Sequence, residues 1–178
     1  MAFYYLEIIV LSFIQGFSEF IPVSSSAHLI VATNLANFKV GSLELDIGLH
    51  LGSLLAIIFY FRKDLVNIFN NKDLAYLIFI GSIPLITFGY FLYFTGLINH
   101  LRNIEIIAWT TLIFSFLLYY SDQFKVKKKI KKDLKIKNII IIGLFQVLAL
   151  VPGVSRSGIT ITGGRILNFS RLDSSKIS

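Results

Sequence analysis

The sequence predicts an all-α integral membrane protein that crosses the bilayer several times. Hydrophobic residues make up 55% of the 178 positions and charged residues only 15%, which is more apolar than a soluble domain of this length usually is. Three stretches are long and nearly free of charge, and two further apolar regions are each interrupted by polar residues and a proline. Cysteine is absent, so neither a disulfide framework nor a cysteine metal site can be argued.

The three long stretches are the predicted membrane spans, since about 20 apolar residues cross the hydrocarbon as a helix. Residues 74–97 contain no charged side chain. Residues 106–121 are also uncharged and slightly shorter. Residues 43–61 qualify as a span if Glu44 and Asp46 lie at the membrane interface.

Each of the other two apolar regions predicts a broken or re-entrant helix pair. Residues 2–36 are interrupted by Gln15, Gly16, Glu19, Pro22 and the serines at 24–26. Residues 138–169 are interrupted by Gln146, Pro152, Gly153, Ser155, Arg156 and Ser157. Irregular backbone at membrane depth is tolerated only when it is buried in protein or lines a water-filled cavity. Each break therefore predicts a functional site at membrane depth.

The two breaks resemble one another, which predicts an internal repeat. Ser24 follows Gln15 by nine residues, and Ser155 follows Gln146 by nine residues, although the prolines are offset by one position. We expect one membrane domain over residues 1–178, with a first repeat at 1–121, a connector at 122–137 and an incomplete second repeat at 138–178. Because three spans separate the breaks, the breaks should enter from opposite faces, as in inverted-repeat membrane proteins.

The positive charge predicts the orientation. Eight of the seventeen Lys and Arg residues lie in residues 125–137, and the loops on that side carry eleven against two on the other. The positive-inside rule makes this connector cytoplasmic and opens the first break to the outside. We interpret the lysines as a topology anchor on anionic lipid, not as a nucleic-acid site. The N-terminus carries Glu7 and no basic segment, so we interpret it as mature structure and not as a signal peptide.

The two breaks together carry groups suited to phosphate. Ionisable residues inside a membrane are functional candidates by default, and here these are Glu19, His28 and Arg156. Arginine presents a planar fork that matches phosphate oxygens. Glu19 and His28 can exchange protons, and Ser25 becomes a candidate nucleophile if one of them lies within hydrogen-bond reach.

Further residues at the breaks can support an anion. Ser24 or Ser155 can start a helix whose N-terminal amides favour negative charge. The other candidates are diphosphate-binding residues Ser26, Gly153, Ser157 and Gly158, and supporting residues Gln15, Gln146 and Thr160. Two alternatives stay open: the serines can serve only as helix caps, and Glu19 can be a structural or proton-relay residue.

The residues of both breaks match a known family. Residues 15–29, QGFSEFIPVSSSAHL, resemble the first signature of the bacterial undecaprenyl-diphosphate phosphatases of the bacitracin-resistance type, whose acidic half is here Gln15 and Glu19. Residues 148–164, LALVPGVSRSGITITGG, resemble the second signature, a Pro-Gly-x-Ser-Arg-Ser-Gly block. Residues 49–64, LHLGSLLAIIFYFRKD, are also similar to the family.

The resemblance implies a function in the bacterial cytoplasmic membrane. Members remove the terminal phosphate from a C55 polyprenyl diphosphate, which regenerates the carrier lipid of peptidoglycan synthesis and confers bacitracin resistance. By this resemblance Glu19 and His28 are acid/base or phosphate-orienting groups, Ser25 is a possible nucleophile and Arg156 clamps the diphosphate. Whether Ser25 or an activated water attacks stays open.

The resemblance also bears on a metal and on chain length. Some members are helped by a divalent cation such as Mg²⁺ or Ca²⁺. Gln15 replaces a second Glu and weakens a two-carboxylate site, which leaves Glu19 as the candidate ligand. Members continue with further membrane helices after the second signature, so we expect the isolated 178-residue chain to be poorly active or inactive.

Three alternatives remain at the level of sequence. An inverted-repeat transporter or flippase for an anionic lipid or small anion would use Arg and Ser for binding, but would not need Glu19 and His28 beside a serine. A lipid phosphatase of the acid-phosphatase type needs a nucleophilic His that neither His50 nor His100 provides, and we interpret both as structural. A purely structural membrane subunit is the last class. The sequence does not predict an oligomeric state.

Overall fold

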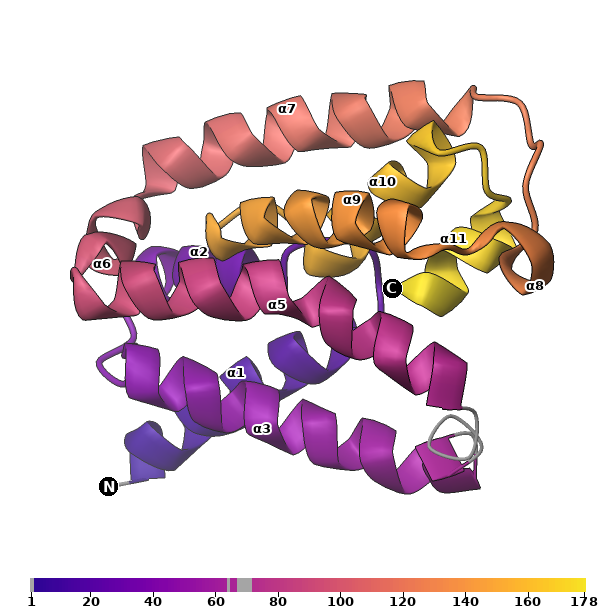
Figure 1. Ribbon diagram of the computed structural model, residues 1–178. Coiled ribbons are helices and arrows are strands. Elements are labelled where there is room, and N and C mark those ends of the chain that lie inside the picture. The colour runs from indigo at the N-terminus through magenta and orange to yellow at the C-terminus, as the bar shows by residue number, and fades with distance from the viewer. Residues whose placement is uncertain (1, 64, 67–71) are drawn as a thin grey trace.

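The computed structural model describes residues 2–63, 65–66 and 72–178. Asp64, the last residue of the 49–64 motif, lies outside the described residues, as do Met1 and residues 67–71. Over the described ranges the regular structure is helical, apart from an isolated bridge between Lys128 and Phe169 (Figure 1).

The three predicted spans are confirmed as helices long and apolar enough to cross a membrane: α3 (Leu43–Tyr60), α5 (Lys72–Phe94) and α7 (Ile104–Asp122). Their apolar side chains are largely exposed, since α5 buries no residue and α3 buries only Asp46. Such surfaces are costly in water and favourable in lipid. The chain is a membrane protein.

The second span ends earlier than predicted. Residues 74–97 were expected to form one helix, but α5 ends at Phe94 and α6 (Leu97–Leu101) begins separately. Gly96 adopts a φ of 71°, a left-handed conformation that ends a right-handed helix and that glycine adopts without steric cost. The polypeptide turns here before α7 starts at its N-cap, Asn103.

Both predicted interruptions separate two helices. The first lies between α1 (Ala2–Ser18) and α2 (Ser25–Leu35), and the second between α9 (Ile136–Val147), extended by η1 (Leu148–Leu150), and α10 (Arg156–Ile166). In Figure 1 the start of α1 and the end of α2 lie at the same end of the molecule as α6. The start of α9 and the end of α10 lie at the opposite end, beside α8 (Ile130–Asp133) and α11 (Arg171–Ile177).

Close packing fixes the second hairpin against the spans. α9 packs on α5, where a Cβ on Gly143 would lie 2.4 Å from the carbonyl oxygen of Gly81. α10 packs on α7 and α11. Near its C-terminus, buried Arg165 donates to the carbonyl oxygens of Phe169, Asp122 and Phe124. The sequence did not single out this arginine, which ties α10 to the end of α7.

Candidate active site

Each break ends in a serine that caps the helix after it. Ser24 accepts a hydrogen bond from the N–H of Ala27 at 3.3 Å, and Ser155 accepts one from Gly158 at 3.2 Å. Each cap also contacts the serine two positions after it, at 3.2 Å in both cases. Serine is favoured at such positions because its hydroxyl satisfies a backbone N–H that has no partner within the helix. The serines therefore are helix caps, and they lie at helix ends that favour an anion.

The two breaks touch. The backbone N–H of Gly153 donates to the hydroxyl of Ser24 at 3.3 Å. Two threonines of α7 satisfy the carbonyl groups of the second break: Thr110 donates to Pro152 at 2.7 Å and Thr111 to Gly153 at 3.3 Å. Irregular backbone at membrane depth is stable when its polar groups are paired in this way.

Gly153 is required where the second break meets α7. Its φ is 95°, a conformation that side chains with a Cβ rarely adopt. A Cβ would lie 2.1 Å from Oγ1 of Thr110 and 2.8 Å from the carbonyl oxygen of Ile107. Any side chain would therefore push the break away from α7 and from Ser24.

A cavity of about 470 Å³ lies between the two breaks and α3. Its polar wall comes from the two breaks and its apolar wall mostly from one face of α3. The lining residues are Glu19, Val23, Ser24, Ser25, Ser26, Ile47, His50, Leu51, Leu54, Ile57, Ala149, Val154, Ser155, Arg156 and Ser157. A polar end beside an apolar wall suits an amphiphilic ligand.

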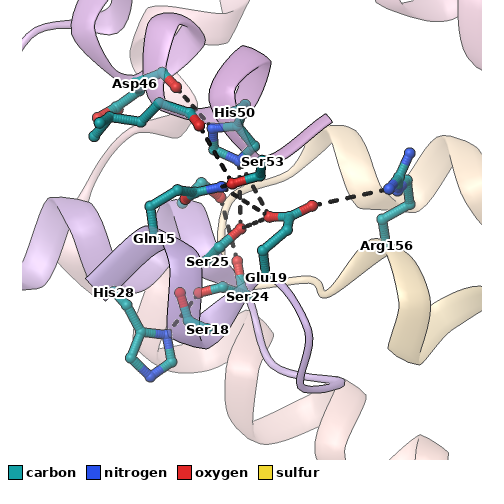
Figure 2. A network of polar contacts seen from close by, with 12 residues as sticks. Gln15, Ser18, Glu19, Ser24, Ser25, His28, Asp46, His50, Ser53 and Arg156 are labelled. Carbon is teal, nitrogen blue, oxygen red and sulfur yellow. Dashed lines mark hydrogen bonds and ion pairs between the residues drawn. The ribbon is translucent and has the colours of Figure 1, made fainter. Parts of the chain in front are cut away.

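Glu19 is the centre of the polar wall (Figure 2). The hydroxyl of Ser25 donates to Oε2 of Glu19 at 2.6 Å, and Nε2 of Gln15 donates to the same oxygen at 3.0 Å. The other carboxylate oxygen faces Nη2 of Arg156 at 3.9 Å, so Glu19 connects the two breaks electrostatically. Arg156 keeps 59% of its side chain exposed, which leaves its guanidinium available to a ligand.

His50, and not His28, is the histidine of this cluster. Nε2 of His50 lies 3.3 Å from Oγ of Ser25 and 3.6 Å from Oε2 of Glu19. Our interpretation of His50 as structural missed this, although Asp46, His50 and Ser53 are spaced as one polar face of α3. The side chain of His28 points away from the cluster in Figure 2 and lines a different hollow with Phe13 and Phe17.

Comparison with known proteins identifies the family. The family model described as bacitracin resistance protein BacA matches residues 8–178. This chain belongs to the BacA family. The resemblance drawn from the two signatures is thereby confirmed.

Named relatives agree with this membership. An undecaprenyl-diphosphatase of Pelagibacter ubique (strain HTCC1062) is 56% identical over 174 residues, which cover 97% of this chain and 68% of the relative. Proteins of the same name from Ruegeria sp. (strain TM1040) and Jannaschia sp. (strain CCS1) are 40% and 38% identical. The matches cover 97% and 94% of this chain, and 70% and 68% of those relatives.

Six of the predicted site residues are absent from the lining of the cavity: Gln15, His28, Gln146, Gly153, Gly158 and Thr160. Gly153 and Gly158 are buried where the breaks meet, and an added Cβ on Gly158 would lie 3.5 Å from the carbonyl oxygen of Pro22. Thr160 donates to the carbonyl oxygen of Arg156 at 2.9 Å and so stabilises the first turn of α10.

The residues of the cavity do not fit a divalent cation held by the protein alone. Among the described residues, no group of three or more His, Cys, Asp and Glu side chains is placed to hold a metal ion. Glu19 is the single carboxylate of the lining, and Ser25, Gln15 and Arg156 already surround it. Asp46, the nearest other candidate on α3, is paired with Arg102. Mg²⁺ and Ca²⁺ bound by protein require several oxygen ligands.

Proposed function

We propose that this chain is an undecaprenyl-diphosphate phosphatase, which removes the terminal phosphate of the C55 lipid diphosphate and leaves the monophosphate carrier. The observation that carries the proposal is the convergence of Glu19, Ser25 and Arg156 from two separate breaks on one cavity. The names of the relatives supply the substrate. The reaction would supply the carrier lipid of peptidoglycan synthesis, in keeping with the bacitracin resistance that the family description names.

In this proposal the second break and the N-terminal ends of α2 and α10 bind the diphosphate. Arg156 is positioned to pair with the phosphate oxygens, because its guanidinium lines the cavity and is mostly exposed. The first turns of α2 and α10 begin at the cavity, and their amides and dipoles favour an anion there. The apolar side chains Ile47, Leu51 and Leu54 on α3 provide a wall for the first part of the lipid chain.

Ser25 is the proposed nucleophile, with Glu19 as its base. A hydroxyl becomes a competent nucleophile when an adjacent base takes its proton, and 2.6 Å is within that reach. Oγ of Ser25 forms a bond to the terminal phosphorus while the bridging P–O bond breaks, the hydroxyl proton passes to Glu19, and the lipid monophosphate leaves. Water then attacks the phosphoserine, releases phosphate and regenerates Ser25.

Attack by water without a phosphoserine is the alternative step. Glu19 would then take a proton from the water, and Ser25 would only bind the phosphate. Rapid acid quenching of a reaction with lipid labelled in its terminal phosphate separates the two routes. Phosphoserine at position 25 supports covalent catalysis, whereas turnover that persists in Ser25→Ala without a labelled protein supports direct attack.

The same arrangement supports a placement in the membrane. The opposed hairpins α1–α2 and α9–α10 would enter a bacterial inner membrane from opposite faces, as the two halves 1–121 and 138–178 of an inverted repeat. The connector at 122–137 is then cytoplasmic, because it lies at the same end of the molecule as the end of α3 and the start of α5 (Figure 1) and carries eight lysines. In this orientation we expect the cavity to open toward the periplasm.

Release of inorganic phosphate is the experiment that tests the function. The chain, purified in detergent with the C-terminal helices of a full-length relative joined to it, should release phosphate from undecaprenyl diphosphate, and Glu19→Gln should lower that rate by about 10²–10³. Ser12→Ala is the matched control, because Ser12 is exposed and bonds only to the carbonyl of Ile8 among the described residues. A transporter or flippase would bind the lipid and release no phosphate.

A further inference from the structure

The two histidines near the first break make the same backbone hydrogen bond. Nδ1 of His50 lies 2.8 Å from the carbonyl oxygen of Asp46, and Nδ1 of His28 lies 2.7 Å from that of Ser24. A carbonyl oxygen only accepts hydrogen bonds, so Nδ1 carries the hydrogen in both rings. In the neutral form of each ring the lone pair is therefore on Nε2.

The two rings differ at Nε2. That atom of His50 faces Oγ of Ser25 at 3.3 Å and Oε2 of Glu19 at 3.6 Å. The neutral ring can accept the hydroxyl proton of Ser25, and the protonated ring can pair with the Glu19 carboxylate. His28 is exposed, and no such pair faces its Nε2 among the described residues.

The surroundings hold the ring of His50 in this position. Ser42 caps the start of α3 by accepting from the N–H of Leu45. One turn before His50, Asp46 is buried and its carboxylate pairs with Arg102 at 2.5 Å. One turn after His50, Ser53 lies 3.4 Å from Nε2 of Gln15.

The charged groups around the ring come from three parts of the fold. Glu19 faces it from the first break, and Arg156 of α10 faces the far oxygen of that carboxylate. The Asp46–Arg102 pair lies one turn away, on α3 and on the segment before α7. The nearest charge to Nε2 is therefore the Glu19 carboxylate.

We infer that His50 is the second proton carrier of the phosphatase site, an inference that rests on the proposed function. When Oγ of Ser25 bonds to phosphorus and the bridging P–O bond breaks, the proton reaches Nε2 of His50, directly or through Glu19. When water attacks the phosphoserine, its proton passes to Glu19, the P–Oγ bond breaks, and His50 returns its proton to Oγ. The proton on Glu19 then leaves with the phosphate or to solvent.

The pH dependence of phosphate release tests this role. Glutamine can keep a hydrogen bond at position 50 but cannot take up a proton. We expect His50→Gln to lower kcat/KM by roughly 10–100-fold near pH 8, less than the range for a sole base because Glu19 remains. The loss should shrink toward pH 5, where a histidine is protonated and cannot accept. Imidazole added to His50→Ala should restore part of the rate.

His100→Gln is the matched control, since His100 lies in α6 and does not line the cavity. Its rate should stay within about twofold of the wild-type rate at every pH, because the expected effect of a group outside proton transfer is small. A loss in His50→Gln that is equal at all pH values would overturn the inference, as would a pH-dependent loss in His100→Gln alone.

A second measurement does not depend on turnover. The chain has three histidines, so ¹⁵N-histidine NMR in detergent resolves each ring once His28→Gln and His100→Gln assign the signals. Glu19→Gln should change the chemical shift of Nε2 in His50 and leave the signals of His28 unchanged, because only His50, of the described histidines, faces this carboxylate. A His50 signal that does not respond to Glu19→Gln overturns the inference. A His50 signal that responds, in a wild-type protein that is extended by the C-terminal helices of a relative and still releases no phosphate, overturns the proposed function and the role that rests on it.

Discussion

The backbone N–H of Gly153 donates to the hydroxyl of Ser24 across 3.3 Å, which joins two breaks that are 129 residues apart in the chain. Both partners are buried. Ser24 also caps α2, so one hydroxyl serves a helix end and the contact between the two halves of the site. The position of Arg156 relative to Glu19 depends on this contact.

Ser24→Ala should therefore destabilise the protein. It removes a helix cap, worth about 1 kcal/mol, and leaves a buried N–H without a partner, which costs about 1–3 kcal/mol. We expect the apparent Tm in detergent to fall by roughly 5–10 °C. Ser26→Ala is the control, because Ser26 contacts Ser24 but caps no backbone N–H among the described residues. Equal Tm values for the two variants would contradict the joining role of Ser24.

Gly153→Ala should be more damaging than Gly96→Ala or Gly16→Ala. The left-handed φ costs about 1–3 kcal/mol and the overlap with Thr110 a similar amount. Gly96→Ala shares the positive φ but has no atom within 4 Å of the new Cβ, and Gly16→Ala has neither problem. In thermal unfolding, the apparent Tm should be lowest for Gly153→Ala, intermediate for Gly96→Ala and highest for Gly16→Ala. A Gly153→Ala protein as stable as Gly96→Ala would show that the break moves freely from α7.

Substitutions of the two arginines of α10 should have different effects, one on activity and the other on stability. Arg156→Ala removes a mostly exposed group of the cavity and should lower phosphate release by about 10²–10³ with little change in Tm. Arg165→Ala leaves three carbonyl oxygens without their buried donor and should cost on the order of 3 kcal/mol. Thermal unfolding and phosphate release measured on both variants check the contrast. A lower Tm in Arg156→Ala, or a loss of phosphate release in a stable Arg165→Ala protein, would contradict the roles assigned to the two residues.

The proposed orientation predicts which cysteines an impermeant reagent reaches. The chain has no native cysteine, so single substitutions report one site each. Lys39→Cys, between α2 and α3, should react with an impermeant maleimide on intact spheroplasts. Lys129→Cys, at the start of α8, should react only after the membrane is opened. Labelling of Lys129→Cys from outside would show that the chain has the opposite orientation to the one proposed.

Much of this fold was predictable because lipid imposes simple rules. The long uncharged stretches could only be spans, and the polar, proline-marked interruptions could only be breaks. The serines at 24 and 155 were predictable as helix starts because capping is a local property of sequence. The early end of α5 was missed because the conformation of Gly96 depends on how α6 continues the chain.

The histidine of the site was not predictable from the motif that contains its partners. His28 lies three residues after Ser25 in the signature, yet its side chain bonds to the carbonyl of Ser24 and faces away. His50 lies in an apolar span whose packing against the first break is a tertiary property. The available signal was the spacing of Asp46, His50 and Ser53 on one helical face. Arg165 carried no local signal, because its partners are backbone carbonyls at the end of α7, just after α7 and in the loop before α11.

Phosphate release from undecaprenyl diphosphate, measured on the chain with the C-terminal helices of a full-length relative joined to it, tests most directly whether residues from both breaks form one diphosphate site. We expect release by this extended wild-type protein, a loss of about 10²–10³ in its Arg156→Ala variant, and retained release in a folded Arg165→Lys variant. Release that survives Arg156→Ala, or no release by the extended wild-type protein, would contradict a shared site.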